Sequence, residues 1–112
     1  MILYNVTVKV DPAISEDWLK WLREEHIPEV LGTGCFEEAT LLQLLDTDES
    51  EGPTYAIQYK AADREAVDRY LEVHAQALRA KGTTRWGNQF VAFRSLLKVI
   101  NCCLLYTSPS PR

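Results

Sequence analysis

Hydrophobic and polar residues alternate along parts of the chain in the manner of β-strands. Every second residue from Ile2 to Val10 is hydrophobic, and the positions between them include polar side chains. A two-residue period of this kind predicts a strand with one buried face. Residues 54–60 repeat the pattern, and residues 36–45 and 90–100 are predicted as further strands. Because leucines occupy both faces of residues 36–45, a helix is the competing interpretation of that segment.

Between these strands, hydrophobic residues recur at spacings of three and four, which is typical of helices packed on a sheet. The first helix is predicted over residues 14–26, and Pro28 is expected to stop or kink it. Its stripe is Ile14, Trp18, Trp21 and Leu22. The second helix is predicted to begin at Asp63, a good N-cap residue, and to end before Gly82. Its stripe is Val67, Tyr70, Leu71, His74 and Leu78.

The predicted elements follow the order β-α-β-β-α-β, which indicates an α+β, ferredoxin-like fold for residues 1–100. In this fold both helices lie on one face of a four-stranded antiparallel sheet. The other face is expected to mix polar and hydrophobic residues: Leu3, Asn5, Thr7, Lys9, Ala56, Gln58, Lys60, Ala92, Arg94 and Leu96. Such a face favours a homodimer, a dimeric α+β barrel in which two sheets pack together. A sheet face exposed to water is the alternative.

Composition and charge narrow the function classes. The 112-residue chain is 46% hydrophobic and 25% charged, as globular proteins are. Its net charge of −4 argues against nucleic acid as a partner, because that binding depends on clustered Lys and Arg. No stretch is apolar over the roughly 20 residues that cross a bilayer, and the N-terminus does not resemble a signal peptide. We therefore expect a cytoplasmic protein with neither a membrane nor a nucleic acid as its partner.

The C-terminal segment differs from the rest of the chain. Residues 103–112 read CLLYTSPSPR, which resembles the translation of a transposon-type sequencing adapter. We therefore expect residues 101–112 to be an artefactual or non-native tail. Cys35 is then the one cysteine that lies clearly within the domain. A cytosolic thiol of this kind is expected to act as a small buried apolar residue rather than as a nucleophile.

Several segments of the chain resemble a known family. These segments are residues 1–8, residues 18–31, Tyr59 and residues 90–100. They look like an uncharacterised family of small bacterial, Bacteroidetes-type ferredoxin-like proteins known only as a domain of unknown function, and the likeness covers residues 1–100. More distantly, the segment from His26 to Pro28 resembles the His-x-Pro of dimeric α+β barrel proteins. That superfamily contains cofactor-independent monooxygenases, isomerases, dehydratases and haem-degrading enzymes, and the resemblance implies a pocket between sheet and helices.

His26 and Glu25 are the candidate catalytic residues. His26 flanks the hydrophobic stripe at the end of the first predicted helix, where an imidazole titrates near neutral pH and can act as acid or base. Its alternative role is to interact with the last carbonyl groups and the dipole of the helix. Glu25 lies near the centre of the stripe, where a carboxylate needs a partner or a bound ligand. Arg94 is the possible partner, unless strand alternation directs it to the other face.

Trp18, Trp21, Tyr59 and Arg94 are the candidate ligand-binding residues. The resemblance places the inner face of the first helix along the pocket, where the two tryptophans would form flat walls for a small apolar or aromatic ligand. Without a ligand they would be ordinary core residues. No cofactor and no metal site are predicted, because the Cys, His and Glu side chains lack the close paired spacing of metal ligands.

These features favour a homodimeric small-molecule-binding or accessory protein. One alternative is a cofactor-independent enzyme of the dimeric α+β barrel type, a monooxygenase, isomerase or dehydratase that uses His26 as acid or base. The other alternative is a structural interaction module. A cavity bordered by Trp18, Trp21, Glu25 and His26 would support binding or catalysis, whereas a fully packed space between helices and sheet would leave only the structural module.

Overall fold

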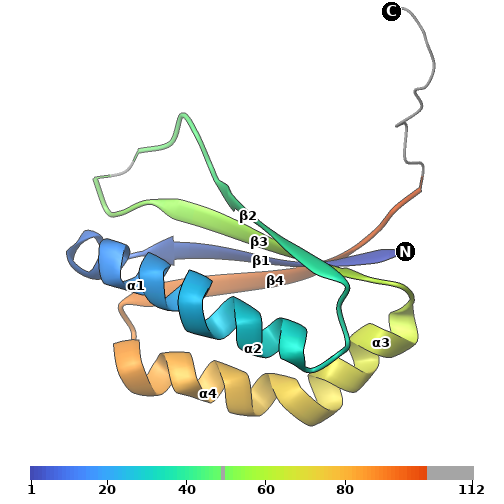
Figure 1. The fold of residues 1–112 in the computed structure, drawn as a ribbon. Helices are drawn as coiled ribbons and strands as arrows, with labels where there is room; N and C mark the ends of the chain where they lie inside the picture. Colours follow the sequence, from blue (N-terminus) through green and yellow to red (C-terminus); the bar gives the residue numbers. More distant parts are fainter. Residues whose placement is uncertain (49, 101–112) are drawn as a thin grey trace, which may run out of the picture.

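The computed structural model describes residues 1–48 and 50–100, so the expected tail at residues 101–112 lies outside the described residues. The strands are β1 (Ile2–Val10), β2 (Glu38–Gln43), β3 (Thr54–Ala61) and β4 (Phe90–Lys98). They form an antiparallel sheet in the order β2-β3-β1-β4. Two helical segments cover one face of this sheet (Figure 1). The predicted α+β ferredoxin-like fold is therefore confirmed, and residues 36–45 contain a strand rather than a helix.

Each helical segment contains a π-helical turn in its middle. The first segment consists of the 3-10 turn η1 (Pro12–Ile14), α1 (Ser15–Trp21), the π turn η2 (Leu22–His26) and α2 (Ile27–Gly32). The second consists of α3 (Arg64–Arg69), the π turn η3 (Tyr70–His74) and α4 (Ala75–Trp86). The N–H of Ile27 donates to the carbonyl of Leu22, five residues earlier, and Ala75 donates to Tyr70 in the same way. Each π turn therefore holds one residue more than a turn of α-helix.

Both helical segments are longer than the sequence predicts, although the second begins as expected with the Asp63 carboxylate accepting a hydrogen bond from the N–H of Ala66 at 2.9 Å. The first segment continues through Pro28 to Gly32 instead of ending. Pro28 is the second residue of α2, just after η2, where the regular hydrogen-bond pattern that a proline interrupts is already altered. No helix among the described residues is both long and apolar enough to cross a membrane.

Gly82 lies inside the second helical segment instead of after its end. A Cβ atom on Gly82 would lie 3.3 Å from Cη2 of Trp21 and 3.5 Å from Cζ of Phe90. The missing side chain thus lets α4 approach both the first helical segment and β4. This close packing offsets the helix-propensity cost of glycine, which is about 1 kcal/mol.

The register of β4 corrects the predicted assignment of its faces. Ala92 pairs with Val8, Arg94 with Val6 and Leu96 with Tyr4, so these β4 side chains point toward the helices, not away from them. The strand contains hydrophobic residues at both odd and even positions, and a shift of one residue exchanges the two faces. Alternation within β4 alone therefore could not decide which side chains are inside.

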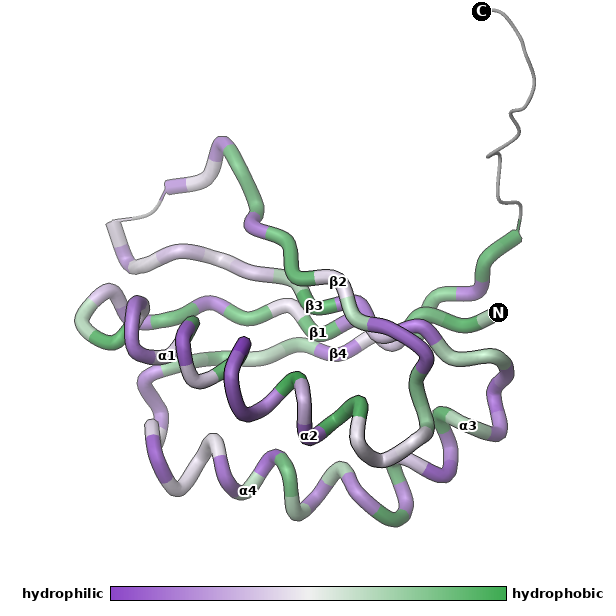
Figure 2. The backbone as a smooth tube through the Cα atoms, in the orientation of Figure 1, coloured by the Kyte–Doolittle hydropathy of each residue, from purple (hydrophilic) through white to green (hydrophobic). Residues whose placement is uncertain are grey.

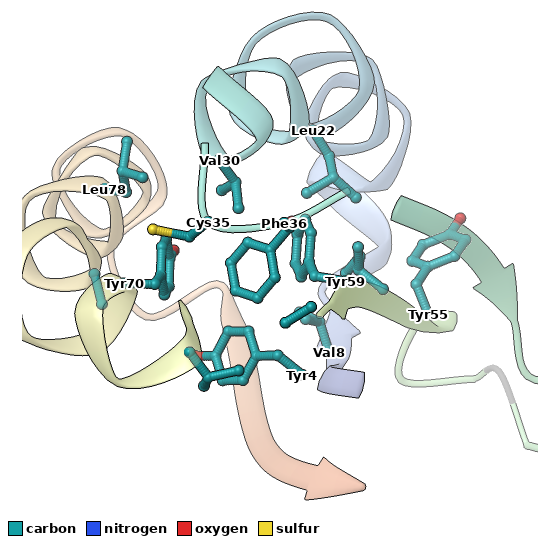
Figure 3. Packing of buried hydrophobic residues seen from close by; sticks show 14 of the residues in the cluster. Tyr4, Val8, Leu22, Val30, Cys35, Phe36, Tyr55, Tyr59, Tyr70 and Leu78 are labelled. Atoms are coloured by element: carbon teal, nitrogen blue, oxygen red, sulfur yellow. The ribbon is translucent and has the colours of Figure 1, made fainter. Parts of the chain in front are cut away.

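The core lies between the sheet and the helical segments. Figure 2 shows hydrophobic residues recurring along the strands and along the helices between hydrophilic ones, as expected for elements with one buried side. In Figure 3, side chains of the sheet and of the helical segments point into the space between them, among them Tyr4, Val8, Tyr59, Leu22, Val30, Tyr70 and Leu78. The ring of Phe36 packs within 5.9 Å, centroid to centroid, of Tyr4, Tyr59 and Tyr70. Cys35 is buried beside this cluster, as predicted.

The opposite face of the sheet is not covered by a helix (Figure 1). The register of β1 and β3 places the polar residues predicted for this face on it, including Asn5, Thr7 and Gln58. It also bears hydrophobic side chains that are more than one-third exposed: Leu42, Val91, Phe93 and Leu97. This outer face is therefore more apolar than the sequence predicts.

Candidate functional site

A cavity lies between the sheet and the helical segments. Its walls are largely aromatic, with rings from Tyr4, Trp18, Trp21, Tyr59, Tyr70 and Phe90. Counted as the space open to the centres of water-sized molecules, its volume is about 50 Å³. A single water needs roughly 10–15 Å³ on this measure, so the cavity has room for a few waters or a small organic group. The predicted packing alternative, a fully filled space between helices and sheet, is therefore wrong.

The π turn η2 brings His26 to this cavity. In a regular α-helix, residue 25 would continue the stripe of Trp18, Trp21 and Leu22. The extra residue in η2 rotates the following residues around the helix axis, so that His26 takes the inward position. Its imidazole stacks on the Trp21 ring with 4.8 Å between centroids. The sequence thus predicts the right residue at the cavity, although that prediction assumes a regular α-helix.

The electrostatic surroundings keep the His26 imidazole neutral. Burial lowers the pKa of His26 from the ordinary 6.5 to about 4. The charge of Glu29 opposes this shift, while Arg94 and Lys81 add to it. A neutral imidazole has one N–H and one acceptor nitrogen. The Nδ1 atom is buried and has no hydrogen-bond partner among the described residues.

Glu25 does not reach the cavity. It is exposed, and its Oε2 atom lies 3.5 Å from Nη1 of Arg85 on α4. The prediction placed this carboxylate on the hydrophobic stripe with Arg94 as its possible partner; instead it lies in solvent and pairs with Arg85. Because η2 moves Glu25 off the hydrophobic stripe, the structure does not bring the two predicted catalytic residues together.

The four predicted ligand-binding residues, in contrast, all line the cavity. Trp18 is buried and stacks on Tyr55, and its Nε1 atom has no hydrogen-bond acceptor among the described residues. Trp21 and Tyr59 are also buried. Arg94 reaches the cavity because the register of β4 turns it toward the helices. Its side chain is exposed, which places it at the mouth.

The site also contains residues that were not among the predicted site residues. Tyr4 and Tyr70 belong to the predicted inward stripes, so periodicity is the signal that could have found them. Arg79 on α4 donates a hydrogen bond from Nη2 to the hydroxyl of Tyr4 at 2.8 Å. Nothing in the periodicity distinguishes Arg79 from the other basic residues of α4. Burial raises the pKa of Tyr70 to about 12, and burial also raises the pKa of Tyr59, so both phenols keep their protons at neutral pH.

Acidic and metal-binding groups do not gather here. No Asp or Glu is among the described residues that line the cavity. Across residues 1–48 and 50–100, no three His, Cys, Asp or Glu side chains are placed to hold a metal ion. The site therefore consists of aromatic walls, a neutral imidazole, phenols and guanidinium groups.

The fold and the cavity define a ferredoxin-like α+β protein with a small internal site. The chain belongs to the family described as a domain of unknown function (DUF4286), which it matches over residues 1–100. The family resemblance read from the sequence is thereby confirmed, and the match ends where the expected tail begins. No curated protein sequence matches the chain significantly.

Several solved structures share the fold. A dimeric ferredoxin-like protein from an uncultured marine organism has a TM-score of 0.66 at 11% identity, with 89% of this chain and 94% of that chain covered. SnoaB, a cofactor-independent oxygenase from Streptomyces nogalater, has a TM-score of 0.63 at 20% identity, with coverages of 91% and 95%. An ethyl tert-butyl ether d (ethd) family protein from Bacillus halodurans has a TM-score of 0.63 at 11% identity, with coverages of 85% and 97%. At these identities the similarity shows the fold alone.

Proposed function

We propose that this chain is a homodimeric small-molecule-binding protein and that each copy binds a small, flat, largely apolar molecule in its cavity. The observation that carries the proposal is a cavity with aromatic walls, two of whose lining residues, Trp18 and His26, have a buried polar atom without a hydrogen-bond partner. Leaving a buried polar group without a hydrogen bond costs about 1–3 kcal/mol. A ligand with polar atoms at its edge would satisfy both groups, and its flat faces would fit the aromatic walls.

The homodimer is supported by the outer face of the sheet. Exposed Leu42, Val91, Phe93 and Leu97 lie on a face that no helix covers. Two such faces from identical subunits would bury each other around a twofold axis. A protein with the same fold is described as a dimeric ferredoxin-like protein. Native mass spectrometry of the protein purified from its source should give the mass of two chains and would also reveal a ligand that remains bound; a ligand-free monomer would contradict the proposal.

Benzamide, a small flat neutral molecule, provides a direct test of binding. In a ¹⁵N-labelled protein, the indole N–H signals of Trp18 and Trp21 should shift and saturate as benzamide is added. Trp86 does not line the cavity, so its indole signal is the internal control and should not move. Replacement of each tryptophan by phenylalanine assigns the three signals. Equal small shifts of all three, or no shift at all, would overturn the proposed binding site.

A second candidate function is that of a cofactor-independent enzyme in which His26 removes a proton from the ligand. The unpaired Nδ1 of a neutral imidazole in the cavity supports it, and SnoaB, which shares the fold, is a cofactor-independent oxygenase. A base is most effective when its pKa lies near the working pH, and burial holds the pKa of His26 at about 4. Binding therefore ranks ahead of catalysis.

Deuterium exchange distinguishes these two functions. The compound 2-indanone is flat and has acidic C–H bonds next to its carbonyl group. If His26 is a base, the protein should accelerate exchange of these hydrogens in D₂O, and His26→Ala should lose the acceleration while the Trp18 indole signal still shifts with benzamide. Exchange at the rate of buffer alone, with benzamide binding intact, would leave the protein as a binder.

A further inference from the structure

The mouth of the cavity carries uncompensated positive charge. Resting on the ligand-binding function proposed above, we infer that the natural ligand is a small aromatic monoanion, of the aryl carboxylate type, whose oxyanion is held at the mouth by Arg79 and Arg94. The aromatic part would lie inside, against Trp18 and Trp21. The chemical class thus follows from the two ends of the cavity, one apolar and buried and the other cationic and open to water.

The two arginines are placed to act on the same group. Arg79 comes from α4 and Arg94 from β4, and both are exposed while the aromatic walls behind them are buried. Arg79 is held by its hydrogen bond to the hydroxyl of Tyr4. Burial raises the pKa of Tyr70, and the charges of Arg79 and Arg94 both oppose that rise, so both guanidinium groups act on the region of this phenol. An anion beside Tyr70 would therefore be attracted by the positive charges of both arginines.

The other basic residues that face the first helical segment are already paired. On α4, Lys81 forms an ion pair with Glu29, and Arg85 forms one with Glu25. Neither Arg79 nor Arg94 forms an ion pair with a carboxylate among the described residues. Because no acidic residue of the described chain lines the cavity, its field favours a negatively charged guest.

The hydrogen-bonding groups of the cavity point to the same class of ligand. The guanidinium groups, the indole Nε1–H of Trp18 and the phenols of Tyr59 and Tyr70 are donors, whereas the neutral His26 imidazole supplies one acceptor nitrogen. A ligand rich in acceptor oxygens matches this surplus of donors. A planar carboxylate in particular can accept two parallel hydrogen bonds from one guanidinium group.

Benzoate and benzamide test the inference, because they have the same size and shape but differ in charge at neutral pH. Each is titrated at pH 7 into the full-length protein, and affinity is read from the indole signals of Trp18 and Trp21. Benzoate should bind at least roughly tenfold more tightly than benzamide, as expected when neutral hydrogen bonds become charge-assisted ones. The preference should shrink as salt is added, since both arginines are at the surface.

Matched variants test whether the preference for benzoate comes from Arg79 and Arg94 at the mouth of the cavity. Arg79→Gln and Arg94→Gln should each reduce the ratio of benzoate to benzamide affinity, and the double variant should bring it close to one. Arg94→Lys should keep most of the preference, because the charge remains. Arg85→Gln is the control, since this exposed residue of α4 pairs with Glu25 outside the cavity, and it should keep the full ratio. Near-native indole signals show that each variant is folded.

The outcomes separate this inference from the function on which it rests. If neither probe moves the Trp18 and Trp21 signals, the proposed binding function itself is overturned. If both probes bind equally well, the cavity binds ligands but the assignment of an anion is wrong. A preference for benzoate that survives the double variant would likewise overturn the role of Arg79 and Arg94.

Discussion

At the scale of the residue, His26 is the side chain whose state depends most on its surroundings. It stacks on Trp21 in a partly buried position, and the loss of hydration lowers its pKa to about 4. The folded protein therefore holds a neutral imidazole, while the unfolded chain takes up a proton near pH 6.5. This difference links the stability of the fold to pH.

We predict that His26 makes the protein less stable as the pH falls from 6.5 to 4. Its stabilising effect is fully present above pH 6.5 and is lost over this window, because the unfolded state binds a proton that the folded state does not. The difference between a pKa of 6.5 in the unfolded chain and a pKa of about 4 in the folded protein corresponds to about 3 kcal/mol in the free energy of unfolding. Urea unfolding across this range should show a flatter pH dependence for His26→Gln than for the wild type. NMR titration of the ring should have its midpoint near pH 4, and a midpoint near 6.5 would contradict the prediction.

At the scale of the element, the two π turns set which side of each helical segment faces the sheet. In the second segment, η3 turns Ala75 inward, to 2% exposure, and leaves Leu71 at 37%. A regular α-helix over the same residues would keep Leu71 on the stripe with Val67 and Tyr70. The same shift in η2 exchanges Glu25 for His26 at the cavity. Which side chains face the sheet and the cavity therefore depends on the one extra residue in each π turn.

A pair of matched substitutions tests which side of the second helical segment faces the sheet. Ala75→Gln should lower the free energy of unfolding by about 2 kcal/mol or more, because a larger polar side chain must enter a packed core. Leu71→Gln should cost less than about 1 kcal/mol, because that side chain is already partly in water. Urea unfolding of both variants measures the two values. The reverse order of costs would indicate a regular α-helix in place of η3.

At the scale of the whole molecule, one face of the sheet is covered by helices and the other carries exposed hydrophobic residues. Phe93 is 69% exposed in the centre of β4, opposite Thr7 of β1. Large apolar surfaces of this kind on a single chain mark an interaction site. A second copy of the chain would cover the outer face with the same residues on both sides.

Phe93→Glu should therefore convert the proposed dimer into a monomer, because two like charges would meet near the centre of the shared face. Sedimentation velocity or native mass spectrometry measures the change. Val73→Glu is a matched control, since Val73 is 64% exposed but belongs to the helical layer. It should leave the dimer intact. A dimer that tolerates Phe93→Glu, or that Val73→Glu dissociates, would place the contact elsewhere.

The sequence by itself determined the features that depend on local patterns. Alternation and helical spacing predicted the order of strands and helices, the N-cap at Asp63 and the inward positions of Trp18 and Trp21. These features follow from the short periods of strand and helix, which neighbouring residues express without help from the rest of the chain. The ferredoxin-like fold and four of the side chains now found at the cavity, Trp18, Trp21, Tyr59 and His26, could therefore be predicted.

Only the tertiary structure decided which side of each helical segment faces the sheet and how β4 is registered against β1. A π turn is locally unfavourable, so the packing of both helix ends on the sheet must stabilise it. No short-range sequence period predicts it. Hydrophobic residues lie on both faces of β4, so pairing with β1 and the partial burial of Phe90 beside Val10 decide which side is inside. These long-range choices place Arg94 at the cavity and Glu25 outside it. They turn an expected pocket into a site with aromatic walls and a cationic mouth.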